Sequence, residues 1–275
     1  MFTTLIDAAT LQTHLGDPAW VIVDCRFSLA EPAAGRQAYL AGHIPGAIYA
    51  HLDEELSNPP ATDHGRHPLP PPEVLAARFG QMGIGPATQV VAYDDANGMI
   101  AARLWWMLRY MGHTAVAVLD GGWPAWLAGE YAVRLGEERR NTAVFQGQPR
   151  PDWLVVENDV PDVPLLVDSR DSARYRGELE TIDPVAGHIP GAVNYYYQTN
   201  WTENGRYLAA DVLRERFVRL LGGVPPQQAT FYCGSGVSAC VNLLAMAHAG
   251  LGNGRLYAGS WSEWCRNPAN SLVTG

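Results

Sequence analysis

The chain has 275 residues, a length that permits one large domain or two of ordinary size. Its composition, 47% hydrophobic and 17% charged, is typical of a folded globular protein. A net charge of -9 argues against a nucleic-acid-binding protein, although a local arginine cluster can still bind a small anion. No run of 18 apolar residues is present, so we expect no membrane span. The first residues lack the pattern of a signal peptide, so we expect a cytoplasmic protein.

Short apolar runs alternate with helical patterns in the first half of the chain. We expect strands at 20–24, 89–93 and 115–119, where apolar and β-branched residues follow one another. Apolar residues at helical spacing predict helices at 73–82 and 99–111. Strands that are apolar throughout and interleaved with helices predict an α/β fold. Its sheet should be mostly parallel, with helices on both faces.

The second half shows the same alternation. We expect strands at 164–168, 229–232 and 255–257, and helices at 208–221 and 237–249. In the first of these helices the predicted apolar face consists of Leu208, Val212, Phe217, Leu220 and Leu221. Open α/β sheets bind ligands at the carboxyl ends of their strands, so a site is expected there.

The two halves repeat one another. The string AGHIPGA occurs around His43 and again around His188, and a VD-x-R string precedes it in both places. We therefore predict two copies of one domain, at 1–135 and 153–275, joined by a polar linker at 136–152. Because both copies keep these strings, we interpret their histidines, aspartates and arginines as architectural, with each histidine bonded to the backbone.

Cys233 follows the predicted strand at 229–232 and precedes the glycine-rich turn Gly234–Gly236. Free backbone N–H groups and the start of the next helix would favour its thiolate over its thiol. Lowering the pKa by roughly two units from about 8.5 would take about 2.7 kcal/mol. A buried core cysteine is the alternative. The first copy has Asp94 at the equivalent place, and a carboxylate cannot carry sulfur, so we predict that this copy is catalytically inactive.

These features together resemble the rhodanese superfamily over nearly the whole chain. The resemblance implies two tandem rhodanese-like α/β domains. The loop CGSGVS resembles the CGSGVT loop of the family's 3-mercaptopyruvate sulfurtransferases, whereas its thiosulfate sulfurtransferases carry basic residues at the places of Gly234 and Ser235. It therefore implies transfer of a sulfane sulfur from 3-mercaptopyruvate, through a persulfide on Cys233, to cyanide, a thiol or thioredoxin.

The resemblance also implies a proton relay. Ser235 matches the serine of the relay, and His67 and Asp53 match its histidine and aspartate. His67 would take a proton through Ser235 during sulfur transfer, while Asp53 would fix the imidazole. His64 is a nearby alternative, but the sequence HPLP favours His67. A surface or capping role is the alternative for a histidine in a proline-rich loop.

The resemblance implies a small anionic sulfur donor as substrate. Arg174 matches the first of two substrate-binding arginines in this group, but the second would fall near Thr181, where no arginine is present. The preferred donor is therefore left open. Arg176 could compensate, although a surface ion pair is the expected role. We expect no metal and no organic cofactor. The predicted substrate-binding residues are Arg174, Gly234, Gly236, Val237 and Ser238.

The sequence leaves three alternatives to sulfur transfer from mercaptopyruvate. Thiosulfate could be the donor to the same cysteine. A phosphatase would need an arginine closing a C-x5-R loop, and that place holds Ala239, which argues against it. A non-catalytic sulfur-relay module is the third alternative, and the retained Cys233, Ser235 and His67 argue against it. Turnover of mercaptopyruvate, thiosulfate and p-nitrophenyl phosphate would separate these functions.

Overall fold

The computed structural model describes residues 1–60 and 64–275, which form two compact units. The first unit comprises Met1–Ser57, Pro70–Arg150 and Glu203–Arg206, and the second comprises Asn58–Leu69, Pro151–Thr202 and Tyr207–Gly275. The segment Asn58–Leu69 thus lies within the sequence of the first copy but belongs to the second unit. His67, which the sequence-based boundaries put in the first domain, is part of this segment.

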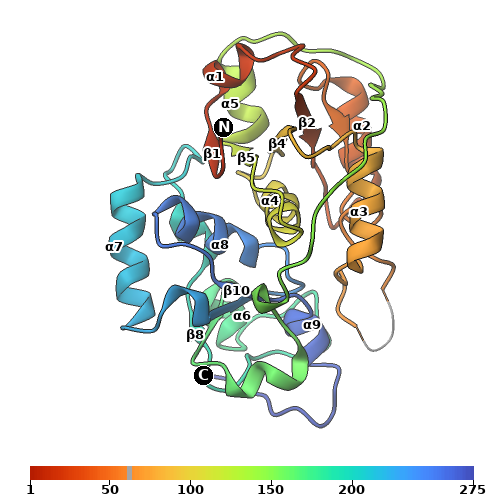
Figure 1. Ribbon diagram of the computed structural model, residues 1–275. Coiled ribbons are helices and arrows are strands. Elements are labelled where there is room, and N and C mark those ends of the chain that lie inside the picture. Colours follow the sequence, from red (N-terminus) through yellow and green to blue (C-terminus); the bar gives the residue numbers. More distant parts are fainter. Residues whose placement is uncertain (61–63) are drawn as a thin grey trace. The chain divides into compact units, whose positions relative to one another are not determined.

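The first unit is built on a parallel sheet with strand order β1-β5-β4-β2-β3. Figure 1 labels β1, β5, β4 and β2 of this sheet. The central strand β4 is buried at every position, as its largely apolar sequence predicts, and α4 packs against β4 and β5. The strands are β1 Leu5–Ile6, β2 Trp20–Asp24, β3 Ile48–Tyr49, β4 Gln89–Tyr93 and β5 Val116–Leu119. The helices are α1 Ala8–Gln12, α2 Ala33–Ala41, α3 Pro72–Gln81, α4 Ala101–Tyr110 and α5 Gly122–Ala128.

The second unit repeats this arrangement, with parallel strands in the order β6-β10-β9-β7-β8. The central strand β9 is again fully buried, and α8 packs against β9 and β10. The strands are β6 Leu154–Val155, β7 Leu165–Asp168, β8 Val193–Asn194, β9 Ala229–Tyr232 and β10 Arg255–Tyr257. The α-helices are α6 Ser172–Tyr175, α7 Ala210–Leu221, α8 Ala239–His248 and α9 Ser260–Trp264, and the 3-10 helices are Pro151–Trp153, Glu157–Asp162, Tyr197–Asn200 and Pro226–Gln228. The same strand order in both units shows that the duplication extends to topology.

The predicted α/β fold is confirmed, and the predicted strands and helices are present to within two residues at each end. The predicted face of α7 is wrong in part. Leu213, Phe217 and Leu221 are buried, whereas Val212 is 38% exposed. Residues four apart lie on one face of a helix, and Val212 is displaced from that face by about 100°. In the described part of the chain, no helix is long and apolar enough to cross a membrane.

The duplicated strings make equivalent contacts in the two units. Arg170 Nη2 donates to Asp168 Oδ2 at 2.7 Å and to Gly187 O at 2.6 Å, and the corresponding bonds in the first unit are equally short. Nδ1 of His43 and Nδ1 of His188 each lie 2.8 Å from a backbone oxygen. The interpretation of these histidines as bonded to the backbone is confirmed.

Candidate active site

Cys233 lies at the carboxyl end of β9 and is 2% exposed. Its N–H donates to Ser260 Oγ at 3.1 Å, and its carbonyl oxygen accepts from Trp261 N at 3.0 Å. The carbonyl oxygen of Gly234 accepts from Ser262 N at 2.8 Å. The start of the loop is therefore fixed by the residues of α9.

The loop then turns through Gly236, which has a φ of 75°. A Cβ at this position would lie 2.4 Å from the oxygen of Ala258, so only glycine fits here. Helix α8 begins three residues later and has no side-chain cap at its N-terminus. Within the described residues, the N–H groups of Ser235, Val237 and Ser238 donate no hydrogen bonds. These donors are free to stabilise an anion at the loop.

The equivalent loop of the first unit holds such an anion. Asp94 occupies the place in the first unit that Cys233 occupies in the second. The carbonyl oxygen of Asp94 accepts from Trp123 N at 2.7 Å, and that of Cys233 accepts from Trp261 N in the same way. The left-handed residue also falls at the same place, at Asn97 with a φ of 58°. The two loops therefore share their backbone course at these points.

Four backbone N–H groups of the first unit converge on the Asp94 carboxylate. Oδ1 accepts from Ala96 and Gly98 at 2.8 and 2.7 Å, and Oδ2 accepts from Ile100 and Ala101 at 2.7 and 2.9 Å. Burial raises the pKa of Asp94, and these donors act against that rise. The loop is thus an anion cradle that its own side chain fills.

The other cysteines have surroundings unsuited to a nucleophile. Burial raises the pKa of Cys25 well above its usual range and raises the pKa of Cys265 to about 11. The Sγ–H of Cys240 donates to Gly236 O at 3.4 Å from within α8. Among the four thiols, Cys233 is the one placed at a strand end in a glycine-rich loop.

The structure brings Ser235 and His67 together. Ser235 Oγ and His67 Nδ1 are 2.7 Å apart, both residues are buried, and the tautomer of the ring decides which atom donates. The segment that carries His67 is fixed nearby, since Arg66 N donates to Ser262 Oγ at 3.0 Å and Gly65 lies against Gly259. The predicted serine–histidine contact is therefore part of the second unit alone.

Asp53 belongs to the first unit. Its N–H donates to His51 Nδ1 at 3.1 Å, and it lines a cavity of about 510 Å³ together with Arg36 and Pro32. Burial raises the pKa of its carboxyl. The role of Asp53 in orienting His67 stays a prediction.

Arg174 lies beside the cysteine loop, at the end of α6. Its Nη1 is 3.7 Å from the position that a Cβ at Gly234 would take. Its Nη2 donates to Glu180 at 2.9 Å and to Asp183 at 3.2 Å. The segment around Thr181 thus supplies carboxylates where the resemblance would place a second arginine. Burial raises the pKa of Asp183, whereas hydrogen bonds from backbone N–H groups and Arg174 outweigh burial and lower that of Glu180.

Arg66 was not identified from the sequence, although it also lies at this loop. It forms an ion pair with Asp183, and its Nη2 is 2.8 Å from the Cβ position at Gly234. In the sequence, its position directly before the HPLP string of His67 could have indicated that it lies near the site.

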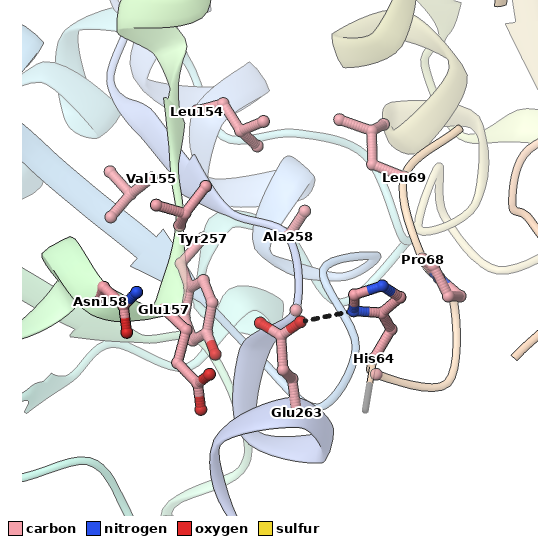
Figure 2. A pocket seen from close by; sticks show the side chains of 13 residues that line it. His64, Pro68, Leu69, Leu154, Val155, Glu157, Asn158, Tyr257, Ala258 and Glu263 are labelled. Carbon is pink, nitrogen blue, oxygen red and sulfur yellow. Dashed lines mark ion pairs between the residues drawn. The ribbon is translucent and has the colours of Figure 1, made fainter. Parts of the chain in front are cut away.

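A separate cavity of about 460 Å³ lies in the second unit, and Figure 2 shows its lining. His64 lies beside Glu263 there, with Nδ1 3.6 Å from Oε1, and Tyr257 and Leu154 form other parts of the wall (Figure 2). Among the described residues its lining includes neither the loop cysteine nor the loop serine. His64 therefore faces this cavity, and His67 is the histidine that reaches the loop. No group of His, Cys, Asp and Glu side chains in the described ranges could hold a metal ion.

Comparison with known proteins identifies the family. A family model described as a rhodanese-like domain matches residues 7–129 and 151–267. A probable 3-mercaptopyruvate sulfurtransferase of Pseudomonas aeruginosa is 44% identical, covering 98% of each chain. A Mycobacterium tuberculosis protein, provisionally named a thiosulfate sulfurtransferase, is 38% identical over 98% of this chain and 97% of its own. The structure of 3-mercaptopyruvate sulfurtransferase from Leishmania major covers 95% of this chain and 74% of its own, with a TM-score of 0.86 and 30% identity.

The family matches cover both halves of the chain, as the internal repeat predicts. The relatives with sulfurtransferase names span nearly its full length. The chain therefore belongs to the rhodanese family and is a sulfurtransferase with two rhodanese-like domains in tandem.

Proposed function

We propose that the protein transfers sulfur from 3-mercaptopyruvate to a thiophilic acceptor through a persulfide on Cys233. The observation that carries this proposal is the 2.7 Å contact between Ser235 Oγ and His67 Nδ1, two residues from the thiol. A thiol donor must move a proton when its carbon–sulfur bond breaks, and a buried serine–histidine pair can move one. Thiosulfate needs no such proton transfer.

In the first half-reaction the Cys233 thiolate attacks the sulfur of the donor. A sulfur–sulfur bond forms, the carbon–sulfur bond breaks, and its electron pair leaves on the three-carbon fragment as the enolate of pyruvate. The proton of the donor thiol passes to the enolate carbon. The products are pyruvate and an anionic persulfide on Cys233, so atoms and charge balance.

Ser235 and His67 provide the path for that proton. In this proposal the serine hydroxyl relays the thiol proton to the imidazole, which returns it to the enolate. Asp53 would fix the orientation of the imidazole. The terminal sulfur of the persulfide is anionic, and the N–H groups of Val237 and Ser238 are suited to stabilise it. A side chain at Gly234 would meet the guanidinium group of Arg66, and one at Gly236 would meet Ala258 O, so both glycines are needed for the course of the loop.

In the second half-reaction the acceptor attacks the terminal sulfur. The sulfur–sulfur bond breaks, the Cys233 thiolate leaves, and cyanide becomes thiocyanate. A thiol or a thioredoxin-like protein would accept sulfur in the same way. The first domain would take no part in this chemistry, because the cradle there contains the Asp94 carboxylate.

Thiosulfate is the second candidate donor. The similarity to the Mycobacterium tuberculosis relative and the guanidinium groups at the loop favour it. The ratio of kcat/KM for the two donors, with cyanide as acceptor, tests the proposal. A higher value for mercaptopyruvate is expected. A higher value for thiosulfate would assign the second function instead.

A further inference from the structure

Two arginine side chains lie against Gly234, the residue after the nucleophile. Arg66 Nη2 and Arg174 Nη1 are 2.8 and 3.7 Å from the place of a Cβ there. A side chain at this position would displace a guanidinium group. The glycine therefore leaves room for positive charge that reaches the loop from two other segments, Asn58–Leu69 and α6.

Carboxylates hold the far edges of both guanidinium groups. Asp183 accepts from Arg66 through Oδ1 and from Arg174 through Oδ2, and Glu180 accepts from Arg174 Nε at 3.1 Å. Within the described residues, Arg66 Nη2 and Nε and Arg174 Nη1 donate no hydrogen bond. The guanidinium nitrogens nearest the loop can therefore still donate hydrogen bonds to a ligand.

The backbone of Arg66 is also fixed. Its N–H donates to Ser262 Oγ at 3.0 Å, and a Cβ at the preceding Gly65 would lie 2.5 Å from Gly259 O. Figure 2 shows the neighbouring His64 paired with Glu263. The fixed backbone and the ion pair of Arg66 with Asp183 together hold the guanidinium group in place before any substrate binds.

We propose that Arg66 determines donor specificity by binding, together with Arg174, the anionic group of the sulfur donor, the carboxylate of an α-keto acid thiol. This inference rests on the function proposed above. An anionic donor that approaches a thiolate is repelled, and two guanidinium groups offset that repulsion. A carboxylate has two oxygens, so each guanidinium group can donate to one of them.

The test compares two donors that differ in one charge. Arg66→Gln is assayed with 3-mercaptopyruvate and with 1-mercapto-2-propanone, which keeps the keto and thiol groups and lacks the carboxylate. The KM for mercaptopyruvate should rise about ten- to hundredfold, because one charge-assisted hydrogen bond is lost. The KM for the neutral donor should change less than about twofold. Inhibition by pyruvate, which keeps the carboxylate, should weaken by the same factor.

Two variants accompany this one. Arg66→Lys keeps the charge and should fall between wild type and Arg66→Gln. Arg176→Gln removes an exposed arginine of the same unit, paired with Glu178, and should change the KM for either donor less than about twofold. Equal losses with both donors, or unchanged inhibition by pyruvate, would overturn the role of Arg66.

The result that would reject the proposed mercaptopyruvate donor differs from the result that would reject the role of Arg66. If the wild-type protein uses thiosulfate and not mercaptopyruvate, the proposed donor is wrong. The role of Arg66 in binding an anionic donor is then tested with thiosulfate, which is also an anion. The KM for thiosulfate should rise in Arg66→Gln, and an unchanged KM would reject the inference.

Discussion

Replacing Asp94 by asparagine removes the anion from the cradle of the first unit while keeping the shape of the side chain. One of the two oxygens becomes an amide NH2 group, which cannot accept hydrogen bonds. Two of the four N–H donors around Asp94 then face another donor in a buried site. Each unsatisfied donor costs about 1–3 kcal/mol, and the asparagine avoids the burial of a charge, so we expect a net loss of about 2–4 kcal/mol.

Hydrogen exchange measured by mass spectrometry on peptides from β4 and α4 reports the stability of this unit separately from the other. Asp95→Asn is the matched control, because it removes the same charge from the exposed neighbour and should change stability by no more than about 0.5 kcal/mol. Equal exchange in the two variants would refute the reasoning that this loop stabilises an anion. The N–H groups of the Cys233 loop would then have no counterpart in the first unit that stabilises an anion.

Two further variants test the second unit. His67→Ala should lower kcat for mercaptopyruvate about 10²–10⁴-fold and affect thiosulfate much less, because only the first donor needs the proton relay; equal losses in a parallel assay would remove that role. Gly236→Ala should destabilise the protein by more than Gly222→Ala in urea unfolding. Both glycines have positive φ, but a Cβ at Gly222 meets open space and one at Gly236 meets Ala258 O. Equal midpoints would contradict the close approach at Gly236.

The sequence predicted the parts of the fold that depend on local pattern. Strands β4 and β9 are largely apolar runs followed by loops that contain glycine, so both the strands and the loops after them could be located. The two-residue strands such as β1 and β8 are too short to show a period, and they exist because they pair with longer neighbours. Short helices such as α6 were missed for the same reason.

In the candidate site, too, residues with a local sequence signal could be predicted and residues defined by tertiary contacts could not. Cys233 was found because it follows a predicted strand and precedes a glycine-rich turn, and Ser235 and His67 were found through the family resemblance. Arg66 was missed because its partners are distant in sequence: it pairs with Asp183, 117 residues further along. The assignment of Asn58–Leu69 to the second unit is likewise a tertiary property that no local pattern encodes.

The central claim is that Cys233 carries the sulfur as a persulfide. Intact-mass measurement after exposure to mercaptopyruvate, followed by peptide mapping, tests this claim directly. We predict one added sulfur atom on the peptide that contains Cys233, its removal by cyanide, and its absence in Cys233→Ser. An unchanged mass in the wild-type protein, or an added sulfur that persists in Cys233→Ser, would contradict the account.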